Sequence, residues 1–380
     1  MFKKGLLTII ILASACLVKA QTLHYKAINV GSGNYYISHR SHNSHSPFIV
    51  SIHQHAVTLK NTATRVNNNI SFGVSPDHSL FGSIYSSNGS YMMGLFENPG
   101  KKILNISSLS FGTNDPSIKI YPLNNGRVII RSNIAHFDIY NPSGKVQASF
   151  SNSSGSLQGE TISKLATDYS GETVIAYNPK INKNGHEESR IQRVNPDNGH
   201  VFTIYYNNKE AISKLLMSHS GDFLAVLFRH KENSQILIMD TYGNIVHHYK
   251  FDYKVDHIAF SNDDRYITMV QGNSVRVFNT YTGHKAGAAY LRGYDVTYAN
   301  YIPQDHVILG LGTDFNESSH TLHKIEFSMV NLRKRKIASK TYSGNLTWYP
   351  GHFPLQIVRL GRDHYRINGF SDPFRVRGDF

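Results

Sequence analysis

The sequence has 380 residues, of which 40% are hydrophobic and 17% are charged, and it contains one cysteine. A single cysteine forms no disulfide within the chain, and a chain of this length needs none, because it buries roughly three quarters of the surface that it exposes when unfolded. The 23 Tyr, 20 Phe and 29 Gly are typical of strands and turns. The excess of 39 basic over 26 acidic residues suits anionic partners, although a role in solubility alone is the favoured interpretation.

The first twenty residues differ from the rest of the chain. Lys3 and Lys4 precede an apolar run from Gly5 to Val18. This pattern predicts a signal peptide over residues 1–20 that is cleaved after Ala20, so that residues 21–380 reach the periplasm or the exterior. The apolar run is shorter than the roughly 20 residues of a membrane span. Cleavage removes three lysines and lowers the net charge from +13 to +10.

A second cleavage site is centred on the single cysteine. The segment from Leu12 to Cys16 resembles a bacterial lipobox in which the leucine is displaced by one position. In this alternative, Cys16 becomes the lipidated N-terminus and anchors the protein to a membrane.

A loop-like stretch rich in Ser, Asn and His follows. Imidazoles bind transition metals, so His39, His42 and His45 are candidate metal ligands. However, no carboxylate lies between Gln21 and Val74, and metal sites usually need ligands that a second shell of hydrogen bonds holds in place. Solvated loop histidines are therefore the favoured interpretation, and we predict no metal or cofactor.

The main signal is a repeat of about 45 residues, the length typical of propeller blades. One copy has predicted strands at 214–217, 223–228, 235–240 and 245–251, and the next has them at 257–260, 266–270, 274–279 and 284–291. An earlier copy has strands at 164–167, 173–177 and 190–194. The equivalent turn residues Asp168, Ser218 and Ser261 lie 50 and 43 residues apart.

The chemistry of the residues explains the repeat. Ser or Asp opens each first turn because its side chain accepts a backbone N–H, and Gly takes the positive φ that the turn requires. The second strand is apolar on both faces, the third alternates and the fourth is polar. This order is expected when units stack against each other with an exposed outer edge. A lone unit cannot bury both faces, so the units must stack and close into a ring.

Two kinds of turn resemble those of a known family. Ser75-Pro76-Asp77 and Ser218-His219-Ser220-Gly221 resemble a Ser-Pro-Asp-Gly turn, whereas Asp240-Thr241-Tyr242-Gly243 and Asn279-Thr280-Tyr281-Thr282-Gly283 resemble the end of a Trp-Asp-x-x-Thr-Gly segment. On these motifs the chain resembles the WD40-like and TolB-like superfamily over most of residues 66–343. The resemblance implies an all-β fold, a β-propeller of four-stranded antiparallel blades. No Trp-Asp dipeptide occurs, so we do not expect the hydrogen-bond network of true WD40 blades.

The number of blades depends on the two ends of the chain. The sequence contains about eight strand clusters, of which residues 22–61 and 344–380 are the most irregular. In the superfamily that the chain resembles, the first and last segments often share one blade. Seven blades are therefore favoured and eight are the alternative, in one monomeric ring over residues 21–380.

One dense basic run, Arg333-Lys334-Arg335-Lys336, follows a predicted strand at 322–330. It is predicted to be the tip of a hairpin, and its four side chains are the candidate contacts for an anion. An acidic glycan or lipid surface would suit these residues, and nothing in the run indicates specific nucleic-acid recognition.

Sequence motifs of catalysis are missing, and we assign no catalytic residue. A single sequence does not show which of Asp168, Asp263, Asp295 and Asp314 converge on a central channel, and most of them fit turns, where Asp is expected. We therefore predict an exported, non-catalytic module that binds protein or glycan. The alternatives are a propeller hydrolase or lactonase with a site at the channel, and a periplasmic protein that binds metal through histidines. Aromatic and basic residues in the channel would favour binding, and convergent carboxylates would favour an enzyme.

Overall fold

The structure is a computed structural model. It describes residues 34–37, 48–53, 56–59, 64–66, 69–76, 79–97, 101–109, 118–133, 136–151, 164–181, 187–207, 210, 212–229, 232–291, 293–319, 321–347, 355, 357–361, 364–367 and 374–375. The predicted signal peptide at residues 1–20, including Cys16, lies outside the described residues, as do His39, His42 and His45.

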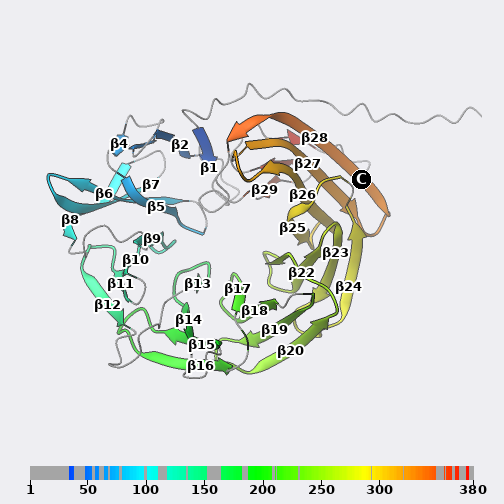
Figure 1. The fold of residues 1–380 in the computed structure, drawn as a ribbon, viewed down its shortest axis with the longest axis horizontal. Coiled ribbons are helices and arrows are strands. Elements are labelled where there is room, and N and C mark those ends of the chain that lie inside the picture. Colours follow the sequence, from blue (N-terminus) through cyan, green and yellow to red (C-terminus); the bar gives the residue numbers. More distant parts are fainter. Residues whose placement is uncertain are drawn as a thin grey trace, which may run out of the picture.

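The described strands form eight antiparallel sheets that follow one another around a ring (Figure 1). The first four sheets consist of β1 (Asn34–Ile37), β2 (Phe48–His53), β3 (Ala56–Leu59) and β4 (Thr64–Val66); β5 (Asn69–Val74), β6 (Leu80–Ser87), β7 (Ser90–Glu97) and β8 (Lys101–Leu109); β9 (Lys119–Pro122), β10 (Val128–Asn133), β11 (His136–Tyr140) and β12 (Val146–Ser151); and β13 (Lys164–Thr167), β14 (Val174–Ile181), β15 (Glu187–Val194) and β16 (Val201–Asn207).

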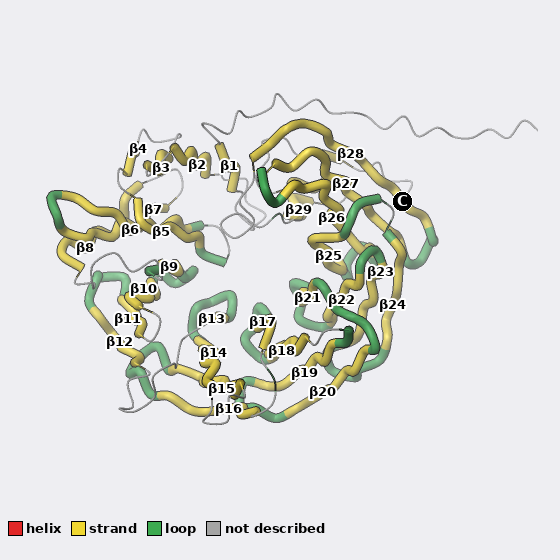
Figure 2. Tube along the Cα trace, in the orientation of Figure 1, coloured by secondary structure: helices red, strands yellow, loops and turns green. Residues whose placement is uncertain are grey.

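The other four sheets complete the ring. They consist of β17 (Ile212–Met217), β18 (Phe223–Arg229), β19 (Ser234–Asp240) and β20 (Ile245–Phe251); β21 (His257–Phe260), β22 (Tyr266–Gln271), β23 (Ser274–Asn279) and β24 (Lys285–Tyr290); β25 (Val296–Ile302), β26 (Val307–Asn316), β27 (Thr321–Asn331) and β28 (Lys336–Thr347); and β29 (Ile357–Gly361), β30 (His364–Ile367) and β31 (Phe374–Arg375). Strands and loops account for every described residue in Figure 2. Within this part of the chain, no helix is long and apolar enough to span a membrane.

Each regular sheet runs from an inner strand near the middle of the ring to an outer strand at its rim, as in β17 to β20 (Figure 1). Burial follows the predicted order. The second strand β18 is buried from Phe223 to Phe228, and the fourth strand β20 is mostly exposed. The third strand β23 of the next blade alternates as predicted, whereas the third strand β19 is mostly buried and does not alternate. The chain is therefore a β-propeller of four-stranded antiparallel blades, and the predicted fold class is confirmed.

The ends of the chain form separate sheets. Strands β1 to β4 pair with one another, and β29 to β31 form a three-stranded sheet of their own. The choice between seven and eight blades stays a prediction. A smaller difference concerns β15, which begins at Glu187 and not at residue 190, because β14 continues to Ile181 and the two strands pair along this extension.

The turn after each inner strand is closed by a side chain, as the sequence predicted. A side-chain oxygen accepts the backbone N–H five residues further on, at 2.8 to 3.1 Å. The residues that provide this oxygen are Ser75, Asp168, Ser218 and Ser261. The same turns place Gly221 at a φ of 84° and Asp264 at a φ of 59°.

These turns also connect one blade to the next. The Asp264 carboxylate accepts the backbone N–H groups of His219 and Ser220, at 2.8 and 2.7 Å, across the boundary between two blades. The Tyr169 N–H donates to the His219 carbonyl at 2.9 Å in the same way. Three consecutive turns are thus linked without the Trp-Asp dipeptide, so this chain has an inter-blade network of its own.

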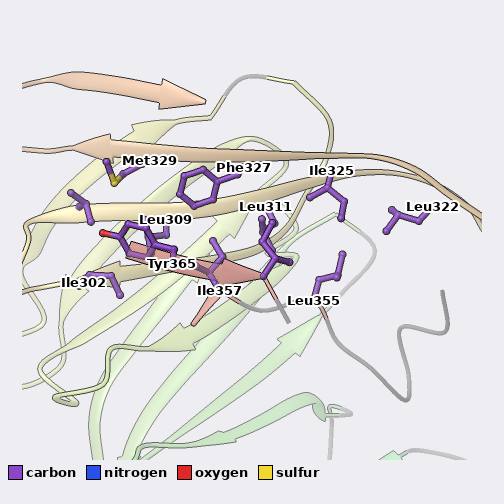
Figure 3. Close-up of a cluster of buried hydrophobic side chains, with 12 residues drawn as sticks. Ile302, Leu309, Leu311, Leu322, Ile325, Phe327, Met329, Leu355, Ile357 and Tyr365 are labelled. Carbon is purple, nitrogen blue, oxygen red and sulfur yellow. The ribbon is translucent and has the colours of Figure 1, made fainter. Parts of the chain in front are cut away.

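The hydrophobic core is divided into clusters that lie between neighbouring sheets. In Figure 3, Phe327 and Met329 on β27 lie close to Ile357 and Tyr365 from the last sheet. The rings of Phe327 and Tyr365 have centroids 6.1 Å apart. Because each cluster takes side chains from two blades, the blades stabilise one another.

Candidate functional site

A cavity of about 700 Å³ lies at the centre of the ring, where the inner strands β13, β17, β21, β25 and β29 face one another. A second cavity of about 410 Å³, beside β5 and β9, shares Pro76 and Thr167 with the first. The two cavities therefore adjoin each other, and together they are called the channel below. The charged, imidazole and aromatic residues that line the larger part are Tyr169, Lys214, His219, His257, Phe260, Tyr298, Phe315, Glu317 and Arg359.

A β-bulge positions Lys214 on the channel wall. Ile212 pairs with Phe228 and Lys214 pairs with Leu227, so Ser213 is an extra residue in β17. The Ser213 hydroxyl donates to the carbonyl of Leu227 at 3.1 Å. Bulges next to functional sites commonly re-aim a side chain.

Lys214 and His257 form a pair inside the channel. The Lys214 Nζ lies 3.2 Å from His257 Nδ1 and 3.4 Å from the carbonyl oxygen of Ile258. Both side chains are partly accessible from the channel but lie deep within the ring. The ring centroids of His257 and Tyr298 are 5.7 Å apart, so an aromatic face lies beside the pair.

The environment changes the ionisation of both groups. Burial, together with the nearby Arg229 guanidinium, lowers the pKa of Lys214 to about 8. Burial and the charge on Lys214 hold the pKa of His257 well below its usual value. His257 is therefore neutral at pH 7, accepts a hydrogen bond from the ammonium at Nδ1 and carries its own proton on Nε2. That buried Nε2 has no hydrogen-bond partner among the described residues.

The other charged groups of the channel differ from Lys214. Arg359 is paired with Asp305 through two contacts of 2.8 and 3.1 Å. Glu317 is exposed, and it is the one carboxylate among the described lining residues. No described carboxylate contacts the Lys214 ammonium. A buried cation without a counter-ion is costly, so this position is chemically suited to an anion.

The channel can act in two ways. At pH 7 the ammonium is charged and can donate to an anion. Above about pH 8 the amine of Lys214 becomes neutral, and a neutral amine is a base and a nucleophile.

The predicted basic run lies elsewhere. Residues 332–335 form the turn between β27 and β28, as predicted, and Asn331 Oδ1 accepts the backbone N–H groups of Arg333 and Lys334. Arg335 has a φ of 54°. None of the four residues Arg333, Lys334, Arg335 and Lys336 lines the channel cavity, and their contact with an anion stays a prediction.

None of the four carboxylates Asp168, Asp263, Asp295 and Asp314 lines the channel cavity. Asp168 accepts the Thr173 N–H within its turn, and Asp263 accepts the Ser261 hydroxyl and the Arg265 N–H. Asp295 and Asp314 are not among the residues that line the cavity. Among the residues that the structure describes, no group of three His, Cys, Asp or Glu side chains could hold a metal ion.

Sequence reasoning missed Lys214 and His257, although a signal was present. Each is near the start of the inner strand of its repeat, and they lie 43 residues apart, the same spacing as Ser218 and Ser261. Two basic residues in equivalent positions of consecutive inner strands face the same channel. Repeat spacing combined with a polar residue in a predicted inner strand would have identified them.

Comparisons with known proteins add little to this description. No family model matches the sequence, and no curated protein matches it. Among solved structures, the chain is similar to the β-propeller domain of Cps50 (Swd1) from Myceliophteria thermophila, with 13% sequence identity and a TM-score of 0.44. The match covers 74% of this chain and 94% of that chain. The assignment of the propeller fold depends on the strand order of the sheets and their arrangement in a ring.

Proposed function

We propose that this protein is an exported, non-catalytic binding module whose ligand enters the central channel of the propeller. The observation that carries the proposal is the composition of the channel wall. Lys214, His257 and several aromatic rings line it, against one described carboxylate. Ligand sites are typically apolar and aromatic cavities with a few polar groups that fix orientation, and a volume of about 700 Å³ suits a small ligand or the end of a glycan.

The channel wall favours binding over glycoside hydrolysis. Glycosidases generally use a pair of carboxyl groups that flank the scissile bond. Glu317 has no second carboxylate beside it among the described lining residues. The net charge of +10 after loss of residues 1–20 supports an acidic glycan as the partner, because the whole molecule attracts polyanions.

Export is part of this proposal and has its own test. Mass spectrometry of the protein from its native host should find Gln21 at the N-terminus. An acylated Cys16 at the N-terminus would instead establish the membrane-anchored alternative, in which the channel binds its ligand at a membrane surface.

Binding in the channel is tested by blocking it. Ala259 lines the cavity on β21, whereas Ala288 is exposed on the outer strand β24. The chain 21–380 should bind acidic oligosaccharides on a glycan array. Ala259→Trp should abolish this binding, whereas Ala288→Trp should leave it unchanged. If both tryptophan variants bind as the wild type does, the ligand does not enter the channel and the proposal is wrong.

A further inference from the structure

We propose that Lys214 and His257 form a carboxylate-binding subsite in the channel, and that the ligand held there is an acidic sugar. This inference rests on the proposed function, since it names the ligand class and the anchoring residue of the same cavity. Three features of the described residues lead to it: an ammonium group without a counter-ion, a donor left over after its internal contacts, and aromatic rings beside it.

The first feature is charge. Arg229 adds a second positive charge near the Lys214 ammonium, and its guanidinium donates to the backbone carbonyls of Val255 and Asp256. Neither cation contacts a described carboxylate at this place. A ligand carboxylate would therefore meet an uncompensated positive field inside a cavity, where charge interactions are screened less than at the surface.

The second feature is the number of hydrogen-bond donors. A lysine ammonium has three N–H groups. Two of them are directed to His257 Nδ1 and the Ile258 carbonyl, at 3.2 and 3.4 Å. One N–H remains for a ligand oxygen, and a charge-assisted hydrogen bond to a carboxylate is the strongest that it can make. The imidazole acts as a positioning group, because its Nδ1 accepts one N–H group of the ammonium.

The third feature is the shape of the neighbouring wall. Tyr298, Phe260 and Phe315 line the same cavity as Lys214. Aromatic rings present flat apolar faces, and Tyr also offers a hydroxyl group, so such a wall suits a ring with one apolar face and polar edges. A sugar acid has such a ring, and its carboxylate would be the counter-ion of Lys214.

The protonation state sets the pH range of binding. The strands β13, β14, β18 and β21 pack against β17. Among the described side chains, the charged or titratable groups that they bring to the Lys214 amine are Arg229 and His257. Arg229 stays charged and His257 stays neutral at pH 7 and above. Binding should therefore weaken as the pH rises through about 8, the pKa of Lys214.

The test measures the binding of glucuronate, the probe, to the chain 21–380 by isothermal titration calorimetry. At pH 7, we expect the wild type to bind glucuronate and Lys214→Met to bind it at least tenfold more weakly. Lys285→Met, which removes an exposed lysine on the outer strand β24, should bind as the wild type does. Glucose and inorganic phosphate, which carry the ring or the charge alone, should each bind more weakly than glucuronate.

A proton balance distinguishes a bound carboxylate from a structural effect of the substitution. A carboxylate beside Lys214 raises its pKa, so at pH 8 wild-type binding should take up a fraction of a proton, measured in buffers of different ionisation enthalpy. Lys214→Gln, a neutral polar variant, should show no uptake, and thermal melting should establish that both variants are folded.

Several results would overturn the inference. They are the absence of glucuronate binding by the wild type, equal binding by Lys214→Met, or binding without proton uptake at pH 8. Phosphate that binds as tightly as glucuronate would overturn the sugar part. If Ala259→Trp abolishes binding but Lys214→Met does not, the channel is the site and Lys214 is not its anchor. If Ala259→Trp has no effect, the proposed function itself is wrong.

Discussion

Lys214 and Ser218 lie four residues apart, Lys214 near the start of the inner strand β17 and Ser218 in the turn that follows it, and their polar groups have different surroundings. The Ser218 hydroxyl is buried and accepts the Phe223 N–H at 3.1 Å. The Lys214 ammonium is placed on the channel wall with a neutral histidine and a carbonyl as its partners. Polar groups in the turns therefore stabilise the ring, whereas the polar pair in the channel costs stability. Polar groups that cost stability are common at functional sites.

The largest effect on the turn side should come from Asp264→Ala. This removes the carboxylate that accepts the His219 and Ser220 N–H groups across two blades, and leaves both donors without that partner. We expect the free energy of unfolding to fall by about 2–4 kcal/mol in urea denaturation. Asp222→Ala, which removes an exposed carboxylate bonded to the Ser220 hydroxyl, is the matched control and should cost less than about 1 kcal/mol.

The same variant has a defined pH dependence. Burial alone would raise the pKa of Asp264, but hydrogen bonds from His219 and Ser220 outweigh it and hold this pKa below its usual value. A depressed carboxyl pKa contributes stability above the unfolded pKa, and this contribution is lost as the pH falls through the folded pKa. The difference between wild type and Asp264→Ala should therefore shrink below about pH 4. A difference that stays constant down to pH 2 would contradict the role of the charge.

Lys214→Met should act in the opposite direction and stabilise the ligand-free protein. The folded-state pKa of about 8 is below the ordinary value of 10.5, so the unfolded chain binds this proton more tightly. The cost is complete below pH 8 and disappears as the pH rises to the unfolded value. We expect a gain of about 1–3 kcal/mol at pH 7, allowing for screening by water in the channel. The gain should decline between pH 8 and 10.5, and a destabilised variant at pH 7 would show that Lys214 does not cost stability.

A smaller loss is expected from Ser261→Ala, which removes the acceptor of the Tyr266 N–H at 3.1 Å. Because one partly buried donor then lacks this partner, the free energy of unfolding should fall by about 1 kcal/mol. Ser213→Ala, in the bulge of β17, provides the comparison on the channel side, since its hydroxyl only donates to a carbonyl that the strand already engages. If both variants lose the same free energy of unfolding in chemical denaturation, the hydroxyl in the turn stabilises the fold no more than the hydroxyl in the bulge.

The smallest effect on stability should come from the basic turn. Replacing Arg333, Lys334, Arg335 and Lys336 by serine should change the free energy of unfolding by less than about 1 kcal/mol, since these exposed residues lie in the turn or at the first position of β28. Retention on heparin should nevertheless weaken and become less sensitive to salt, because exposed charges are screened over about 8 Å at physiological ionic strength. A control with Lys250, Lys254, Arg265 and Lys285 changed to serine has the same charge and should retain the salt-sensitive binding if the turn is the main contact.

The repeat could be predicted from the sequence because its strands and turns depend on residues that are close together in the chain. Strands β20, β21 and β23 have the predicted bounds, and the side chains of Ser218 and Ser261 close their turns as expected. These features depend on residues within a few positions of one another. The contact of Asp264 with the turn of the preceding blade was not predicted, since its partners lie 44 and 45 residues away.

The same distinction explains the candidate site. The alternation of apolar and polar residues determined which strands are inner, central and outer, because the side-chain period of a strand is two and burial selects one face. Only the tertiary structure decided that Lys214 and His257 meet, because a bulge at Ser213 and the closure of the ring bring together side chains from two blades. The local alternation of apolar and polar residues indicates only whether a single side chain is buried or exposed. The pKa of a lysine in a channel depends instead on segments that are distant in the sequence, because these segments exclude water from the lysine and place charges near it.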